Sequence, residues 1–295
     1  MDLSWDRLRP VMRVPYVPTL GPVHADALTP ELIADVFAVA GTGRFLPHDL
    51  NQRWSGSKDE SVVREAVEQG PGRTVIPTLS TLGRGAVKVH YYGAAGDDVP
   101  VDELLQLARR LASRADVDRA YVVWCDPDQA RPQADATVAR LHLKTFRPGE
   151  DDPAVEGVDD LRQLPEQVRA RFPVFAEQTA ADGMAFLWRR FQSDALGGPI
   201  LTVASGERVV GAIGPLETMK DPAGAVRLLP PHLGVLPDQR GLGHDRALWR
   251  AAMHWGQTTG ADYQLLLTDL GSPSDTLYQA EGLQTLGYVH TLTAA

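Results

Sequence analysis

The sequence has a single cysteine, Cys125, and no long apolar run. One cysteine excludes an internal disulfide and any zinc site built from several cysteines. No stretch reaches the roughly 18 consecutive apolar residues typical of a membrane span. Charges and prolines interrupt every apolar run in the first residues, MDLSWDRLRPVMRVPYVP, which is unlike a signal peptide. We therefore expect a cytoplasmic protein in a reducing compartment, with no membrane partner.

An excess of positive charge is also missing. The chain has 29 Lys and Arg residues against 38 Asp and Glu residues, a formal net charge of -9. General binders of nucleic acid or of membrane surfaces need clustered Lys and Arg to neutralise phosphates. The composition excludes such a binder but leaves room for a local basic groove. Hydrophobic residues make up 43% of the chain, which is typical of a globular protein with a sizeable core.

The length of 295 residues suits two domains, at about 100 to 200 residues per domain. An acidic segment with glycines and a proline, GEDDPAVEGVDD at 149–160, indicates an exposed linker. The sequence therefore predicts an N-terminal αβ domain over 1–148 and a second domain over 161–295.

Hydrophobic periodicity and turn residues predict a mixed α/β (α+β) fold. In the first half we expect helices at about 29–40, 59–69 and 102–115, and strands at 86–92, 120–125 and 137–146. In the second half we expect helices at 160–171, 181–192, 245–258 and 274–280, a hairpin of 199–204 and 208–213, an extended stretch at 226–236, and strands at 263–269 and 284–292.

A glycine-spaced turn, RGLGHD at 240–245, stands between the extended stretch and the helix at 245–258. A turn with little side-chain bulk lets backbone N–H groups converge on an anion, and a helix N-terminus adds about half a positive charge. Arg240 adds a guanidinium whose fork suits phosphate oxygens. The pattern favours a phosphate or pyrophosphate ligand. A turn that only connects strand to helix is the alternative.

The second half, from about residue 165, resembles the GNAT acyl-CoA N-acyltransferase superfamily. The resemblance rests on LGVLPDQRGLGHD at 233–245, close to the family's L-x-V-x-P-x-x-R-G-x-G-x-(G/A) signature, and on LYQAEGL at 277–283. It implies a mixed, splayed sheet flanked by helices, and acetyl-CoA or another acyl-CoA as donor substrate. The residues implied in binding coenzyme A are Leu233, Val235, Arg240, Gly241, Leu242, Gly243, His244 and Asp245.

Two prolines, Pro230 and Pro231, interrupt the extended stretch. Proline donates no ladder hydrogen bond, so this stretch is expected to part from the strand that begins at Tyr263. In the family such a gap receives the pantetheine arm of coenzyme A beside Leu233 and Val235. An ordinary bend at a sheet edge is the alternative.

The resemblance also implies N-acyl transfer to an amine by direct attack, without an acyl-enzyme. Tyr278 occupies the place of the family's tyrosine, the acid that protonates the departing thiolate. His232 and Glu217 are the candidate bases for the amine, and each has a solvated surface role as its alternative. The acceptor is a small molecule or a peptide, and a homodimer is compatible with the sequence.

Asp245 stands where the family has glycine or alanine. At a helix start a carboxylate can cap free N–H groups, worth roughly 1 kcal/mol. It also repels a phosphate by roughly 3 kcal/mol at about 5 Å and an effective dielectric near 20. Three outcomes follow: Asp245 faces solvent and coenzyme A binds, the donor is an aminoacyl-tRNA or carrier-protein thioester, or the protein is a non-catalytic ligand-binding relative.

Residues 1–148 contain no catalytic motif. The order of strand 86–92, helix 102–115 and strand 120–125 mirrors the second half loosely, so a degenerate GNAT-like copy is one interpretation and an unrelated αβ domain is the other. His24 and Asp26 are too close together and too isolated to form a metal site. We predict no metal.

Overall fold

A computed structural model describes residues 3–128, 135–147, 149 and 153–294 of the chain. Of the predicted linker, Glu150, Asp151 and Asp152 lie outside the described residues. The chain forms two compact units. The first contains 1–143, 221–223 and 265–295, and the second contains 144–220 and 224–264.

This division differs from one made at a single linker, because 265–295 belongs to the first unit. The cause is the last strand, β16 (Gln284–Thr293), which pairs antiparallel with β7 (Ala120–Asp126) on one edge and with β8 (Ala136–Thr145) on the other. His290 pairs with Trp124, and their rings stack with centroids 5.0 Å apart. The C-terminal strand thus completes the sheet of the first half.

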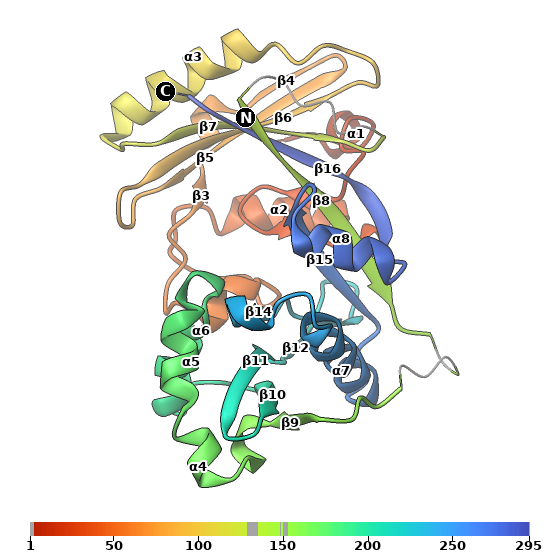
Figure 1. The fold of residues 1–295 in the computed structure, drawn as a ribbon. Coiled ribbons are helices and arrows are strands. Elements are labelled where there is room, and N and C mark those ends of the chain that lie inside the picture. The colour runs from red at the N-terminus through yellow and green to blue at the C-terminus, as the bar shows by residue number, and fades with distance from the viewer. Residues whose placement is uncertain (1–2, 129–134, 148, 150–152, 295) are drawn as a thin grey trace. The chain divides into compact units, whose positions relative to one another are not determined.

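The sheet of the first unit has the order β15-β8-β16-β7-β6-β5-β3, where β15 is Tyr263–Asp269, and β4 also pairs with β5. Most neighbours are antiparallel, but β6 and β7 are parallel and are joined by α3, which lies over them (Figure 1). The other elements of this unit are α1 (Trp5–Leu8), β1 (Tyr16–Val17), β2 (Gly21–Pro22), α2 (Pro30–Ala38), β3 (Ser61–Val62), β4 (Glu68–Gly70), β5 (Arg73–Ser80), β6 (Ala86–Gly93), α3 (Val101–Ala115) and α8 (Pro273–Ala280).

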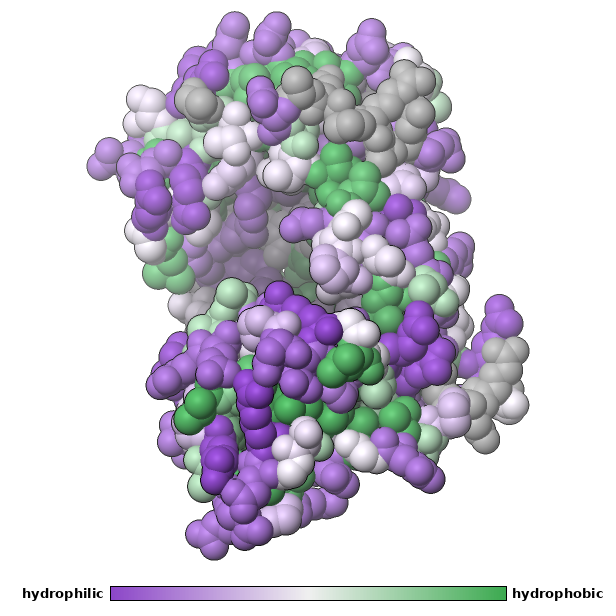
Figure 2. Space-filling view, viewed as in Figure 1, coloured by the Kyte–Doolittle hydropathy of each residue, from purple (hydrophilic) through white to green (hydrophobic). Residues whose placement is uncertain are grey.

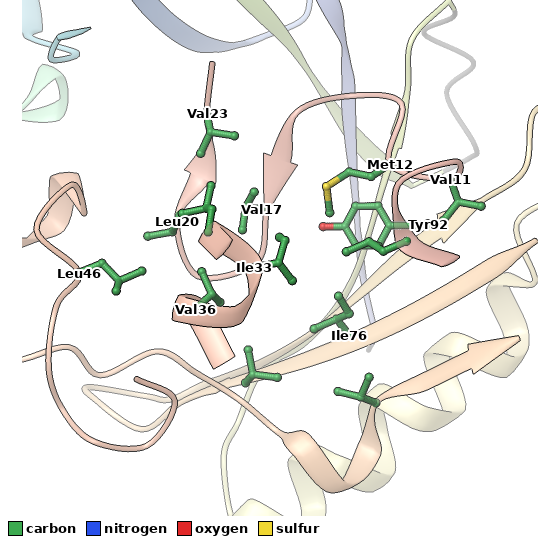
Figure 3. Close-up of a cluster of buried hydrophobic side chains, with 14 residues drawn as sticks. Val11, Met12, Val17, Leu20, Val23, Ile33, Val36, Leu46, Ile76 and Tyr92 are labelled. Atoms are coloured by element: carbon green, nitrogen blue, oxygen red, sulfur yellow. The ribbon is translucent and has the colours of Figure 1, made fainter. Parts of the chain in front are cut away.

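The core of the first unit includes two hydrophobic clusters of described residues. One packs the apolar side of α3, including Leu104 and Ala108, against the valines of β6 and β7. The other fills the space between β5, β6 and the N-terminal segment, where Ile33 and Ile76 are buried (Figure 3). At its edge the Tyr92 hydroxyl donates to the Tyr16 carbonyl over 2.8 Å. The N-terminal segment is therefore an integral part of this core.

The second unit contains a four-stranded antiparallel sheet in the order β14-β11-β10-β9 and the ladder β12-β13-β15. The strand β15 (Tyr263–Asp269) begins in the second unit and runs into the first. The remaining elements are β9 (Val158–Asp160), α4 (Glu166–Arg169), α5 (Phe172–Gln178), α6 (Met184–Gln192), β10 (Leu201–Ser205), β11 (Arg208–Gly214), β12 (Thr218–Lys220), β13 (Val226–Leu228), β14 (His232–Val235) and α7 (His244–Thr258).

Most predicted elements are confirmed, but the helix expected at 59–69 is wrong. The chain there forms β3, a 3-10 turn at Arg64–Ala66 and β4. Both strands pair with β5, so sheet pairing outweighs the local helix preference. The helix expected at 160–171 is shorter, because Pro165 precedes α4 and the residues before it form β9 and a 3-10 turn.

On the surface, hydrophilic and hydrophobic residues mix in small areas over the face shown in Figure 2. In the described part of the chain, no helix is both long and apolar enough to cross a membrane.

Candidate active site

Two strands of the second unit part at the double proline. The strand β13 pairs in parallel with the start of β15, Arg227 with Tyr263 and Leu228 with Gln264. Pro230 and Pro231 follow, and the chain then pairs as β14 with β11 instead. The sheet order places β14 at the end of its sheet, so its second edge has no ladder partner among the described residues. The extended stretch thus parts from β15 after its prolines, as the sequence predicts.

The register of β14 determines which of its backbone groups face the unpaired edge. The Leu236 N–H donates to the Val210 carbonyl over 2.9 Å, which makes these two residues a hydrogen-bonded pair of the ladder. Bonded and non-bonded pairs alternate along antiparallel strands. Leu233 and Val235 are therefore non-bonded positions, and their N–H and C=O groups point away from β11. These are the two residues that the family resemblance implies in binding pantetheine.

The glycine turn that follows β14 is open. Gly241 and Gly243 have φ angles of 76° and 86°, in the left-handed region that favours glycine. A Cβ built on either glycine would meet nothing within 4 Å. Leu242 between them is 65% exposed. The turn thus leaves free space above its backbone.

The backbone N–H groups of this turn have no acceptor in the described protein. From Gly241 to Asp245 no N–H donates a hydrogen bond, and the first helical bond of α7 is Ala247 N–H to the Gly243 carbonyl at 3.0 Å. Free N–H groups at the start of a helix of 15 residues combine with its dipole to attract an anion. The arrangement can hold a phosphate or diphosphate.

Arg240 packs back on the strand that precedes the turn. Its Nε donates to the Val235 carbonyl over 3.3 Å, and its Nη2 lies 3.5 Å from Oδ2 of Asp182. The Arg240 side chain is 61% exposed, so its guanidinium is accessible to a bound anion.

Asp245 is the second residue of α7 and is half-buried. Gly243 is the N-cap residue, and no side chain caps this helix. The capping role considered for Asp245 is therefore wrong. Its carboxylate adds negative charge to the first turn without occupying the free N–H groups.

The two candidate bases both lie in the second unit. His232 begins β14 opposite Gly214, and its ring lies 6.1 Å from that of Phe186. Glu217 follows β11, and its Oε1 accepts from the Gly197 N–H at 2.8 Å. Both residues are half-buried.

Tyr278 lies on α8 in the first unit and is 6% exposed. Burial raises the pKa of Tyr278 to about 12, which keeps the phenol protonated at neutral pH. The helix begins with a cap, in which the Ser272 hydroxyl accepts from the Asp275 N–H over 3.2 Å. Tyr278 belongs to the first unit, and the glycine turn belongs to the second.

A search of family models finds no match, and no curated protein matches. Solved structures do match, among them a GCN5-related N-acetyltransferase from Sphaerobacter thermophilus, with 15% identity, TM-score 0.46, and 88% of this chain and 93% of that chain covered. A tandem GNAT protein from the clavulanic acid biosynthesis pathway has 13% identity and TM-score 0.44, covering 91% and 97%. A GNAT-family acetyltransferase from Colwellia psychrerythraea has 10% identity and TM-score 0.47, covering 99% and 97%.

Beside Tyr278, the first unit contains a buried polar network that the sequence did not reveal. Asp275 is 1% exposed, and its Oδ1 lies 2.8 Å from Arg140 Nε and 3.1 Å from His142 Nε2. Arg140 and His142 come from β8, more than 130 positions earlier in the chain. No local spacing could have indicated this contact.

Metal ligands are a separate question. In the ranges that the structure describes, no group of three or more His, Cys, Asp or Glu side chains is arranged to hold a metal ion.

Proposed function

We propose that the protein is an N-acyltransferase that moves an acyl group, most simply acetyl, from acyl-CoA to an amine of a small molecule or peptide. The observation that carries the proposal is the open turn at 241–245, whose N–H groups have no acceptor in the described protein. Such a nest binds the diphosphate that coenzyme A carries.

The strand before the turn supports the same ligand. The outward N–H groups of Leu233 and Val235 and the Leu233 C=O offer a thioester arm the hydrogen bonds of an added strand, while the Val235 C=O already accepts from Arg240 Nε. Pantetheine contains two amides and can pair in this way. The diphosphate nest and the strand edge adjoin in the chain, which matches the order of the groups in coenzyme A.

The chemistry requires a neutral amine, stabilisation of the tetrahedral oxyanion and a proton for the departing thiolate. His232 or Glu217 takes a proton from the acceptor amine. The nitrogen attacks the thioester carbonyl, and an outward N–H of β14 stabilises the oxyanion that forms. The C–S bond then breaks, and the Tyr278 hydroxyl protonates the thiolate of coenzyme A. The acceptor starts as an ammonium, so the proton that the base removes goes to solvent. After attack the nitrogen loses a second proton, which restores the phenol, and the products are an amide and free coenzyme A.

Calorimetric titration tests this proposal. Acetyl-CoA is expected to bind, whereas S-acetylpantetheine, which lacks the diphosphate, is expected to bind at least tenfold more weakly. Release of free thiol in the presence of a panel of amines then measures turnover. Equal affinity for the two thioesters would contradict the diphosphate site.

The remaining outcomes separate the alternatives. Absence of heat with acetyl-CoA would overturn the proposal. Transfer from an aminoacyl-tRNA or a carrier-protein thioester would then identify a different donor. Acetyl-CoA binding without turnover on any amine would favour a non-catalytic binding protein.

A further inference from the structure

The network around Asp275 ties the helix of Tyr278 to a strand from the first half of the chain. All its members belong to the first unit. Asp275 Oδ1 faces Arg140 and His142 on β8, and Oδ2 accepts from the Gly271 N–H at 2.9 Å and from Gln279 Nε2 at 3.1 Å. The carboxylate thus connects β8, the loop before α8, and α8 itself.

His142 lies between this carboxylate and Tyr278. Its side chain is fully buried, and its Nε2 is 2.9 Å from Thr268 Oγ1 and 3.1 Å from Asp275 Oδ1. A carboxylate only accepts hydrogen bonds, so Nε2 carries the proton. The His142 ring then meets the Tyr278 ring edge to face, with centroids 5.5 Å apart and planes at 79°. Hydrogen bonds at Nε2 therefore hold the imidazole in place, and its ring packs against the phenol ring of Tyr278.

The network places several buried polar groups where apolar side chains could fill the same space. A buried charge pair generally adds little stability compared with apolar residues of similar volume, because desolvating both ions is costly. It does fix geometry, since several hydrogen bonds of defined direction must form together. Here the group whose direction is fixed is the residue that touches Tyr278.

We infer that His142, held by Asp275 and Thr268, is a positioning residue for Tyr278. The first half of the chain would thereby contribute to catalysis through β8, although it contains no catalytic motif. This inference rests on the proposed function for its catalytic part.

A double-mutant cycle tests the catalytic part. His142→Ala is expected to lower kcat about tenfold to a hundredfold while the KM for acetyl-CoA changes less than twofold, because the acid is displaced and the donor site is untouched. In a Tyr278→Phe background the same substitution is expected to lower kcat less than twofold further. His142→Gln keeps a donor for Asp275 and is expected to recover part of the loss. Independent, multiplicative effects of the two substitutions would overturn the inference.

His90→Ala is the matched control for simple destabilisation. His90 is also buried in the first unit, at 2% exposure, and its ring lies 6.1 Å from another tyrosine, Tyr16. If loss of kcat in His142→Ala reflects only a loosened core, His90→Ala will reproduce it, and the inference fails.

Fluorine NMR of protein labelled with 3-fluorotyrosine gives a readout without activity. The chain has seven tyrosines, and the line of Tyr278 is assigned by its absence from Tyr278→Phe. This line is expected to shift or broaden in His142→Ala and to stay unchanged in His90→Ala. An unchanged line in His142→Ala overturns the inference, whereas a wild-type protein that binds no acetyl-CoA overturns the proposed function and leaves this test intact.

Discussion

Two strand–helix–strand crossovers in this protein have helices of equal length, but their strands pair over different lengths. In the first unit α3, of 15 residues, joins β6 to β7, which pair in parallel from Val87–Ala120 to Tyr91–Trp124. In the second unit α7, also of 15 residues, leads to β15, and the parallel ladder of β13 and β15 contains only two residue pairs. One crossover closes its sheet and the other leaves a strand edge open.

A few residues account for this difference. Pro230 and Pro231 end the ladder in the second unit, and Gly241 and Gly243 form the open turn before α7. In the first unit α3 follows Pro100, and its preceding loop carries Asp97 and Asp98 instead of an arginine. The comparison teaches that the crossover is shared architecture, while prolines and glycines at specific positions create the open strand edge and the open turn of the proposed ligand site.

The largest effect on acetyl-CoA affinity is expected when the two glycines of the open turn are replaced. Changing Gly241 and Gly243 together to alanine costs about 1–2 kcal/mol at each left-handed position and redirects the N–H groups. We expect the affinity for acetyl-CoA to fall about a hundredfold by calorimetry. Gly96→Ala, in the loop before α3, has the same strain and open space, with φ of 84°, and should leave the affinity unchanged. Equal losses in both loops would break the comparison.

Asp245→Asn sharpens the comparison, because both helices carry an aspartate at their second position, Asp245 in α7 and Asp102 in α3. Removing the charge beside the free N–H groups is expected to tighten acetyl-CoA binding about tenfold, part of the roughly 3 kcal/mol repulsion being screened by solvent and salt. Asp102→Asn is expected to have no effect on affinity. An unchanged affinity in Asp245→Asn would mean that its carboxylate faces away from the ligand.

Tyr278 in the first unit is a buried ionisable residue, unlike the residues of the open turn in the second unit. The pKa of Tyr278 is raised to about 12 by burial, so between pH 10 and 12 the folded state retains a proton that the unfolded state loses. Stability therefore falls as the pH rises through this window, by about 1 kcal/mol at pH 11 from this group alone. Urea unfolding of wild type and Tyr278→Phe at pH 9 and pH 11 measures the difference. Identical pH dependence in the two proteins would contradict a buried phenol.

The smallest expected effect is on the free energy of unfolding, through the interaction of each aspartate with its helix dipole. Asp245→Asn and Asp102→Asn are each expected to lower the free energy of unfolding by about 0.5 kcal/mol at low salt, because each removes a negative charge from the first turn of a helix. Denaturant unfolding of both variants checks this. A gain in stability in either variant would show that its carboxylate is repelled in the folded state.

Local pattern predicted the second unit's turn and most helices and strands well. The prolines at 230–231 and the glycines at 241 and 243 act through their own backbone, so their effect is readable without knowing the partner. The prediction of a helix at 59–69 was wrong because the short strands there depend on a distant partner. They form by pairing with β5.

Long-range pairing explains what sequence could not predict. The insertion of β16 between β7 and β8 depends on residues from the middle and from the C-terminal part of the chain, and so does the contact of Arg140 and His142 with Asp275. Each of these side chains looks like an ordinary strand or helix residue in its own segment. Only the assembled sheet brings His142 to Tyr278.

A crystal structure with bound coenzyme A tests the central claim most directly. The account predicts diphosphate oxygens about 2.7–3.2 Å from backbone nitrogens between Gly241 and Asp245, with the pantetheine amides paired to Leu233 and Val235. Coenzyme A bound elsewhere, with those nitrogens still lacking an acceptor, would contradict it.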